Sequence, residues 1–296
     1  MKIVSGSSNL SLAKSIAQHL GSDVIDVEIS HFHNGEKRVW IKEPVRGQNI
    51  ILVQSFSAPV DEHIIEYLLL CDALERYGAR HVNVVIPWLG YSLQDKVFRD
   101  GEPIAAKVIA DLVSHSYAKR TFLLDLHNSS TPGFFSVPTQ HLTALDVFTE
   151  YAQKNFDLKN CVVASPDFGG LKRARTFAER LQVNLTKIDK QRNLHTGEIM
   201  DMGLNGEVKG KTVLIFDDLI NSGSTVVSAS EILKQHGAKA VHFFATHGIF
   251  ANNGHERVKN SQVDSVVVTN SIQQPESTKL VVLDVSKVFA DAVTAW

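Results

Sequence analysis

The residues best suited to chemistry lie in Val213–Thr225 (VLIFDDLINSGST), where an apolar strand ends in two carboxylates and a small-residue loop leads into a helix. Glycine and serine let backbone N–H groups approach an anion, and a helix N-terminus adds a partial positive charge. This spacing indicates a phosphate cradle in which Asp217 and Asp218 could hold sugar hydroxyls. A strand end with an acidic turn and a helix N-cap would show the same spacing. The stretch is not a Walker A loop, because GxxxxGK[ST] is absent.

Two basic residues of the segment DKQR, Lys190 and Arg192, follow an expected strand over Asn184–Ile188. They open a long connection to Lys211 that contains glycines and an Asn-Gly turn. A segment of this length could form a small hairpin and act as a lid. Phosphoryl transfer needs cations near the migrating charge, and these two side chains could supply them. They could also be two solvated residues of a surface loop.

Seven motifs in a fixed order carry a family resemblance together with the Val213–Thr225 loop. They are FHNGE (32–36), PVRG (44–47), DLH (125–127), GFFSVP (133–138), SPDFGG (165–170), DKQR (189–192) and ATHGIF (245–250). The chain resembles the ribose-phosphate pyrophosphokinase family, also called phosphoribosyl pyrophosphate synthetases, over nearly its whole length. The resemblance implies that the diphosphoryl group of Mg-ATP is transferred to the 1-hydroxyl of ribose 5-phosphate. The products would be 5-phosphoribosyl 1-diphosphate, for nucleotide biosynthesis, and AMP.

The resemblance also implies roles for individual residues. Those implied to hold ribose 5-phosphate are Asp217, Asp218, Asn221, Ser222, Gly223, Ser224 and Thr225. Those implied to contact ATP are Phe32, Asn34, Glu36, Gln94, Asp95 and Arg99. The diphosphate loop would consist of Asp167, Phe168, Gly169 and Gly170. Lys190 and Arg192 would be the catalytic residues and would stabilise the migrating diphosphoryl group.

Magnesium is the implied cofactor, with His127 and Asp167 as the implied contacts. Both residues follow expected strands, Arg120–Leu126 and Cys161–Ser165, and so would lie at the carboxyl ends of parallel strands, where α/β proteins bind ligands. Asp167 suits Mg²⁺ better than His127, because this ion prefers oxygen ligands. In the family the adenine loop reaches across a subunit interface, which implies a homo-oligomer, either a dimer or a hexamer.

Three features depart from the family pattern. Leu93 stands where many members have arginine, and Asn221 stands where aspartate is common. The segment Lys96–Pro103 is one residue shorter and less basic than in the bacterial enzymes of the family. A non-catalytic regulatory paralogue is therefore one alternative, although the retained Lys190 and Arg192 argue against it. A phosphoribosyltransferase is another, although such an enzyme needs neither the N-terminal domain nor the DKQR motif.

Composition limits the class of protein further. Lysine and arginine total 30 against 32 aspartates and glutamates, so the net charge of −2 disfavours an electrostatic nucleic-acid binder. The two cysteines lie in apolar segments without metal-ligand spacing, which predicts buried thiols. The N-terminus lacks a signal-peptide core, and no run approaches the roughly 18 apolar residues of a membrane helix. We therefore expect a cytoplasmic protein with no membrane partner.

The elements that must position these residues alternate between short β-branched runs and helical patterns. Continuous apolar strands of this kind are typical of parallel sheets covered by helices. The expected strands include Asn49–Gln54, His81–Pro87, Arg120–Leu126, Cys161–Ser165, Thr212–Asp217, Val241–Thr246, Ser265–Thr269 and Lys279–Leu283. The expected helices include Val60–Arg76, Pro103–Leu112 and Thr225–Gln235. We predict an α/β protein with two tandem phosphoribosyltransferase-like domains, each a mainly parallel sheet flanked by helices.

The expected domains are 1–140, with the ATP contacts and the oligomer interface, and 141–296, with the ribose 5-phosphate and catalytic loops. The boundary between the two domains, near residue 140, is defined to within about ten residues. The last helix could pack on the N-terminal domain.

Overall fold

The computed structural model describes residues 1–192 and 199–295, without the side chains of 189–192, 199–203 and 205. The chain forms two compact units. Unit 1 comprises Met1–Thr143, Ser271–Gln273 and Asp284–Trp296, and unit 2 comprises Ala144–Asn270 and Gln274–Leu283. Within the described residues, no helix is both long enough and apolar enough to cross a membrane.

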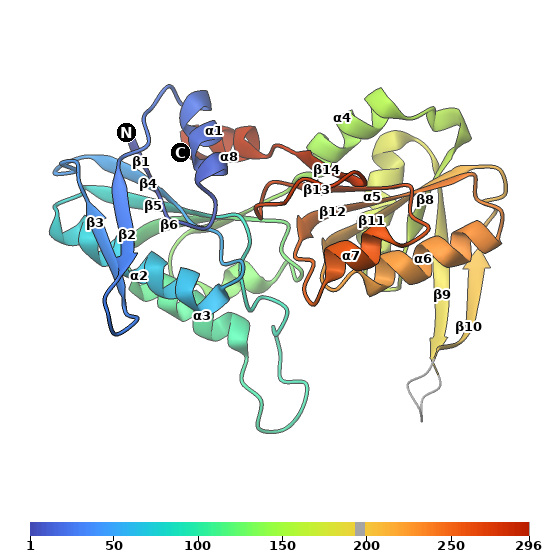
Figure 1. The fold of residues 1–296 in the computed structure, drawn as a ribbon, viewed down its shortest axis with the longest axis horizontal. Helices are drawn as coiled ribbons and strands as arrows, with labels where there is room; N and C mark the ends of the chain where they lie inside the picture. The colour runs from blue at the N-terminus through green and yellow to red at the C-terminus, as the bar shows by residue number, and fades with distance from the viewer. Residues whose placement is uncertain (193–198, 296) are drawn as a thin grey trace. The chain divides into compact units, whose positions relative to one another are not determined.

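Unit 1 is built on a parallel sheet with the strand order β1-β4-β5-β6-β7. Its strands are β1 (Lys2–Ser5), β4 (Asn49–Val53), β5 (His81–Ile86), β6 (Ala118–Leu124) and β7 (Thr139–Leu142). Its helices are α1 (Leu10–His19), α2 (Val60–Arg76), α3 (Ala105–His115), the 3₁₀ turn η1 (Thr131–Phe134) and α8 (Ser286–Thr294). Helices α1 and α8 cover one face of the sheet, and α2 and α3 cover the other (Figure 1). A separate antiparallel hairpin consists of β2 (Val27–His31) and β3 (Lys37–Ile41).

Unit 2 contains a sheet with the strand order β10-β9-β8-β11-β12-β13-β14, parallel except for the β9–β10 pair. Its strands are β8 (Cys161–Ser165), β9 (Asn184–Arg192), β10 (Ile199–Asn205), β11 (Thr212–Ile220), β12 (Ala240–Gly248), β13 (Ser265–Thr269) and β14 (Leu280–Leu283). Its helices are α4 (Leu145–Asn155), η2 (Leu158–Asn160), α5 (Leu171–Leu181), α6 (Ser224–Gln235) and α7 (Gly254–Lys259). Helices α4 and α5 lie on one face of the sheet, and α6 and α7 on the other (Figure 1).

The core of unit 2 shows why these strands carry apolar residues on both faces. Val213 and Ile215 pack against Val226 and Leu233 of α6, whereas the next residue, Phe216, stacks on Phe177 of α5. Consecutive side chains of a strand point to opposite faces, so helices on both sides require apolar residues at successive positions. The mainly parallel sheets confirm the predicted α/β class.

Several predicted strand ends are wrong, and each has a local cause. β9 continues to Arg192 because it pairs with β10, which confirms the predicted hairpin but not the strand end at Ile188. β11 continues to Ile220 because Leu219 and Ile220 still pair with β12. β6 ends at Leu124, since Asp125 has a positive φ of 35° that interrupts the extended backbone.

Both cysteines are buried, as predicted. Cys71 is 1% exposed and Cys161 is 7% exposed. Burial raises the pKa of Cys71 to about 12 and that of Cys161 to about 11. At pH 8 we therefore expect almost no thiolate at either position in the folded protein. Titration with a thiol-reactive disulfide reagent should reveal two thiols only after denaturation, and a thiol reacting rapidly in the folded protein would contradict this.

Candidate functional site

Unit 2 contains a topological switch point between β8 and β11. From β8 the chain passes through α5 to β9 on one side, and from β11 it passes through α6 to β12 on the other. Ligands of open α/β sheets bind outside the carboxyl ends of strands where the order reverses in this way. The expected Asp167–Gly170 and Asn221–Thr225 loops follow these two strands, so the fold brings both loops to the edge predicted to bind ligands.

The loop after β8 is held by its own hydrogen bonds. The Ser165 hydroxyl donates to the Asp167 carbonyl oxygen at 2.7 Å, and the Gly170 N–H donates to Asp167 Oδ1 at 2.9 Å. A Cβ at Gly170 would lie 3.3 Å from Asp217 Oδ1, so the glycine allows the loop to approach the β11 carboxylate closely. Phe168 is 68% exposed, and the Lys187 ammonium lies 3.6 Å from its ring centroid.

The expected sugar ligands Asp217 and Asp218 lie inside β11 and not at its end. Pairing of β11 with β8 stops at Ile215, so the two aspartates lie just beyond the last residue paired on that side. Arg173, in the first turn of α5, is 3.7 Å from Asp217 Oδ1 and 3.2 Å from Asp218 Oδ2. Asp217 Oδ1 also accepts a hydrogen bond from the Asp218 N–H at 2.9 Å.

Negative charge dominates around Asp217. Burial raises the pKa of its carboxyl well above the usual range, and the charges of Asp218 and Asp167 raise it further. The hydrogen bond from the Asp218 N–H acts in the opposite direction. Because the ionised form is disfavoured in the free protein, the site is suited to ligands that bring positive charge or hydroxyl donors.

The predicted phosphate cradle is a loop that leads through Gly223 into the N-terminus of α6. Gly223, with φ of 78°, precedes α6, whose first turn begins at Ser224. A Cβ at Gly223 would lie 2.9 Å from Val258 Cγ2, so both the conformation and the space require glycine. Arg257 donates to the Ser222 carbonyl oxygen, and the Ala251 N–H donates to the Asn221 carbonyl oxygen at 2.8 Å. These bonds fix the loop while the N–H groups of the α6 N-terminus face outward from the helix.

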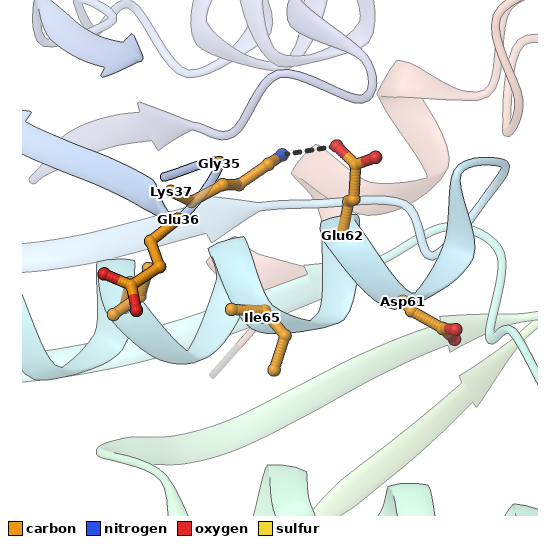
Figure 2. A pocket seen from close by; sticks show the side chains of 7 residues that line it. Gly35, Glu36, Lys37, Asp61, Glu62 and Ile65 are labelled. Atoms are coloured by element: carbon orange, nitrogen blue, oxygen red, sulfur yellow. Dashed lines mark ion pairs between the residues drawn. The ribbon is translucent and has the colours of Figure 1, made fainter. Parts of the chain in front are cut away.

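In unit 1 the expected Phe32, Asn34 and Glu36 form the turn of the β2–β3 hairpin. Phe32 is 52% exposed, and its N–H donates to the Glu36 carbonyl oxygen at 2.8 Å. A pocket of about 490 Å³ lies between this turn and α2. Figure 2 shows Glu36 from the turn, and Asp61 and Ile65 from α2, around it.

The second expected nucleotide segment lies between β5 and α3. The Asn128 amide donates to Asp95 Oδ2 at 2.6 Å, and the Ala106 N–H donates to the Gln94 carbonyl oxygen at 3.0 Å. Arg99 is exposed, and its N–H donates to Glu102 Oε2 at 3.1 Å. The segment is thereby attached both to the residues after β6 and to the start of α3.

The remaining expected residues belong to different units or have side chains outside the described part of the structure. His127 is exposed and lies three residues after the end of β6 in unit 1, whereas the expected strand ends directly before it. Asp167 belongs to unit 2. Lys190 and Arg192 lie on β9, opposite Met202 and Ile199 of β10, and their side chains are outside the described part of the structure.

Sequence reasoning missed Arg173, Lys187 and Arg257. A basic residue in the first helical turn after a glycine-rich loop is a usable signal for Arg173. Lys187 belongs to the same strand as DKQR but precedes the motif, and only the register of β9 against β8 brings it opposite Ser165. Arg257 carries no sequence signal, since α7 is too short for a clear helical pattern.

Comparisons with known proteins agree on one family. Residues 1–116 match the profile of the N-terminal domain of ribose phosphate pyrophosphokinase, and residues 193–295 match that of the phosphoribosyl synthetase-associated domain. The chain is 40% identical over 298 residues to the ribose-phosphate pyrophosphokinase of Fusobacterium nucleatum, covering 99% of this chain and 94% of the relative. It is 39% identical over 298 residues to that of Bacillus caldolyticus, with coverage of 99% and 94%.

A solved structure supports the same assignment. The phosphoribosylpyrophosphate synthetase of Mycobacterium smegmatis superposes with a TM-score of 0.92 at 32% identity, covering 99% of this chain and 97% of that one. The similarity therefore extends over both units and is not confined to one of them. The chain belongs to the ribose-phosphate pyrophosphokinase family and is an enzyme of that kind.

Proposed function

We propose that this enzyme transfers the diphosphoryl group of ATP to the 1-hydroxyl of ribose 5-phosphate. The observation that carries the proposal is the arrangement in β11, where the half-buried Asp217 and the buried Asp218 lie a few residues before the loop that contains Gly223. A phosphorylated sugar presents hydroxyls and a phosphate a few ångströms apart. The carboxylates would accept hydrogen bonds from the ribose hydroxyls, while the loop and the α6 N-terminus would bind the 5-phosphate.

The nucleotide is assigned to unit 1. The exposed Phe32 offers a ring on which adenine can stack, and Asn34, Glu36, Gln94, Asp95 and Arg99 supply polar groups in the two segments. The support is the hairpin turn with its adjoining pocket and the family membership. We also propose a homo-oligomer, at least a dimer, on the basis of the family. The expected cytoplasmic location stays a prediction.

Magnesium fits the donors present. Among the described residues, no group of three or more histidine, cysteine, aspartate or glutamate side chains is arranged to hold a metal ion. Mg²⁺ usually takes one or two carboxylates and completes its coordination with water and substrate phosphates. The exposed Asp167 suits that use, and His127 is the second proposed contact. When bound, the ion would neutralise and orient the phosphates of ATP.

The reaction forms a bond between the ribose 1-oxygen and the β-phosphorus of ATP. The bond from that phosphorus to the α,β-bridging oxygen breaks, AMP leaves with the electron pair, and the hydroxyl proton is released. Positioning and neutralisation of charge are the main contributions that a protein makes to such a step. Lys190 and Arg192 are proposed to stabilise the diphosphoryl group as it moves.

Incubation with Mg-ATP and ribose 5-phosphate tests the proposal. We expect AMP and 5-phosphoribosyl 1-diphosphate in equal amounts, measured by anion-exchange chromatography and ³¹P NMR. A regulatory paralogue would produce neither compound. A phosphoribosyltransferase would instead consume added 5-phosphoribosyl 1-diphosphate in the presence of a base and release diphosphate.

Leu93→Arg should increase the affinity for ATP. Leu93 is half-buried beside Gln94, where many family members carry a cation that can hold the nucleotide. A charge-assisted hydrogen bond is worth about 1.5–3 kcal/mol, and ordering the long side chain costs part of it, so we expect a three- to tenfold lower KM for ATP. Steady-state kinetics at saturating ribose 5-phosphate measure this, with Leu93→Met as the uncharged control. An unchanged or raised KM in folded Leu93→Arg would contradict it.

A further inference from the structure

The β2–β3 hairpin carries the proposed adenine turn, yet its strands pair only with each other among the described residues. Among the described residues, backbone hydrogen bonds to β1 hold the chain just before β2, where the Ile25 N–H donates to the Ile3 carbonyl oxygen at 2.7 Å, but they do not reach the turn. Apolar contacts from Val39 and Ile41 to the core likewise secure the end of the hairpin that lies away from the turn. The end next to the turn needs a different attachment.

Lys37 supplies that attachment. It is the first residue of β3 and directly follows Glu36 of the turn. Its side chain is only 8% exposed, and its ammonium lies 2.5 Å from Glu66 Oε2 and 3.8 Å from Glu62 Oε2, both on α2. Figure 2 shows the Lys37 side chain extended from the strand toward Glu62.

Hydrogen bonds from other residues hold the Glu66 carboxylate in position to pair with the Lys37 ammonium. It is fully buried, and it accepts from the Ser7 N–H at 2.6 Å, the Ser7 hydroxyl at 2.7 Å and the Gln54 amide at 2.9 Å. Burial alone would raise the pKa of Glu66, but the bonds from Lys37 and Ser7 outweigh it and lower the pKa. The carboxylate thus joins α2, the residues after β1 and β4, and the hairpin at one point.

The turn itself is closed, so fixing Lys37 also fixes the turn. Besides the bond between Phe32 and Glu36, the Gly35 N–H donates to the Phe32 carbonyl oxygen at 2.9 Å. The Glu36 N–H donates to Asn34 Oδ1 at 3.2 Å. Displacement of Lys37 would therefore carry Phe32, Asn34 and Glu36 with it.

We propose that the Lys37–Glu66 ion pair is a positioning device that holds the Phe32–Glu36 turn in its nucleotide-binding position. The assignment of nucleotide to this turn rests on the proposed function. Lys37 and Glu66 act through the turn and are not required to touch the nucleotide. If the turn is correctly placed for only a tenth of the time without the pair, the apparent Kd for ATP rises about tenfold.

The test compares Lys37→Met with Lys42→Met. Lys42 follows β3 directly, and its partners Asp26 and Glu28 lie in or beside β2, so its loss removes the same charge without releasing the hairpin from α2. Hydrogen exchange followed by mass spectrometry reports on amides 27–41, and calorimetry gives the Kd values for Mg-ATP and ribose 5-phosphate.

In Lys37→Met we expect faster exchange confined to the hairpin, about tenfold weaker Mg-ATP binding and an unchanged Kd for ribose 5-phosphate. Lys37→Arg should restore part of the nucleotide affinity, and Lys42→Met should match the parent. Should Lys37→Met not fold, Glu66→Gln gives the same comparison, because its amide retains an acceptor for Ser7 but loses the charge opposite Lys37.

Equal hairpin exchange in the parent, Lys37→Met and Lys42→Met would overturn the proposal, as would weakening of both substrates alike. Absence of AMP formation by the parent protein would count against the proposed function instead. Neither the exchange measurement nor the binding measurement depends on turnover, so the two failures are distinguishable.

Discussion

Lys190→Ala is expected to lower turnover 100- to 1,000-fold while the melting temperature stays within a few degrees of the parent. The expected size of the fall in turnover follows from the roughly 100- to 1,000-fold losses of kcat that are typical when one preorganised group that stabilises transition-state charge is removed. Lys190 lies on β9 opposite Met202, in the antiparallel β9–β10 ribbon at the edge of the unit 2 sheet. Lysine side chains are rarely part of an apolar core, so we expect the substitution to leave the folding stability nearly unchanged.

Turnover measured at saturating Mg-ATP and ribose 5-phosphate checks this expectation. Lys209→Ala is a matched control, because it removes the same charge at an exposed position after β10. Comparable turnover of Lys190→Ala and Lys209→Ala would exclude Lys190 from the mechanism. A large fall in melting temperature would indicate a structural role for Lys190.

Asp217→Asn is expected to weaken ribose 5-phosphate binding about 10- to 100-fold and ATP binding much less. Hydrogen bonds to a charged acceptor are worth about 1.5–3 kcal/mol, and the amide forms weaker ones with sugar hydroxyls. The amide oxygen can still accept the hydrogen bond from the Asp218 N–H, so the local backbone should be retained. Calorimetric titration with each substrate measures the effect, and equal losses would contradict the assignment.

The same substitution should make the ligand-free protein more stable at neutral pH. Since the pKa of folded Asp217 is raised, its stabilising contribution is complete below the unfolded value of about 3.8 and is lost as pH rises through the folded pKa. Asparagine does not ionise and avoids that loss.

Asp264→Asn is the control, and we expect it to change the stability of the folded protein in the opposite direction. Burial raises the pKa of Asp264, but Lys234 at 2.7 Å and the Val241 N–H outweigh it and lower the pKa. The stabilising contribution of Asp264 is therefore present above about pH 3.8 and disappears as pH falls through its folded pKa. Thermal unfolding from about pH 2 to pH 8 covers both windows: relative to the parent, Asp217→Asn should gain stability as pH rises above about 4, and Asp264→Asn should lose stability as pH rises from about 2 to about 5. Parallel trends would contradict the charge argument.

The spacing of apolar residues along the sequence correctly predicted the helices and strands whose ends are set by neighbouring residues in the chain. The spacing of apolar residues from Ile64 to Leu74 and the following Gly78 predicted α2 with both ends correct. The apolar runs of β8 and β13 were also correct at both ends, because helices cover both faces of those strands. The order of the motifs identified the family. It also placed the two expected ligand loops after the strands β8 and β11 of unit 2.

Tertiary partners decided the features that the sequence left open. The β2–β3 hairpin was missed because its residues alternate weakly, and it is held by α2 and not by a neighbouring sheet strand. Arg173 became part of the site only because α5 starts beside the β11 carboxylates. The extensions of β9 and β11 depend on pairing with β10 and β12, which apolar periodicity in the strands themselves does not encode.

The packing of α8 on α1 gives the chain an order of completion during synthesis. Buried residues of α8, including Phe289 and Val293, belong with Leu12 and Ile16 of α1 in unit 1, although more than 250 residues separate them. Domains fold as their chain emerges, and long loops delay the contacts that close them. Unit 2 is fully synthesised once Leu283 has left the ribosome, whereas unit 1 still lacks the helix that covers α1. The first unit to emerge is therefore completed after unit 2, and the part of α1 that packs on α8 stays uncovered until α8 has been synthesised.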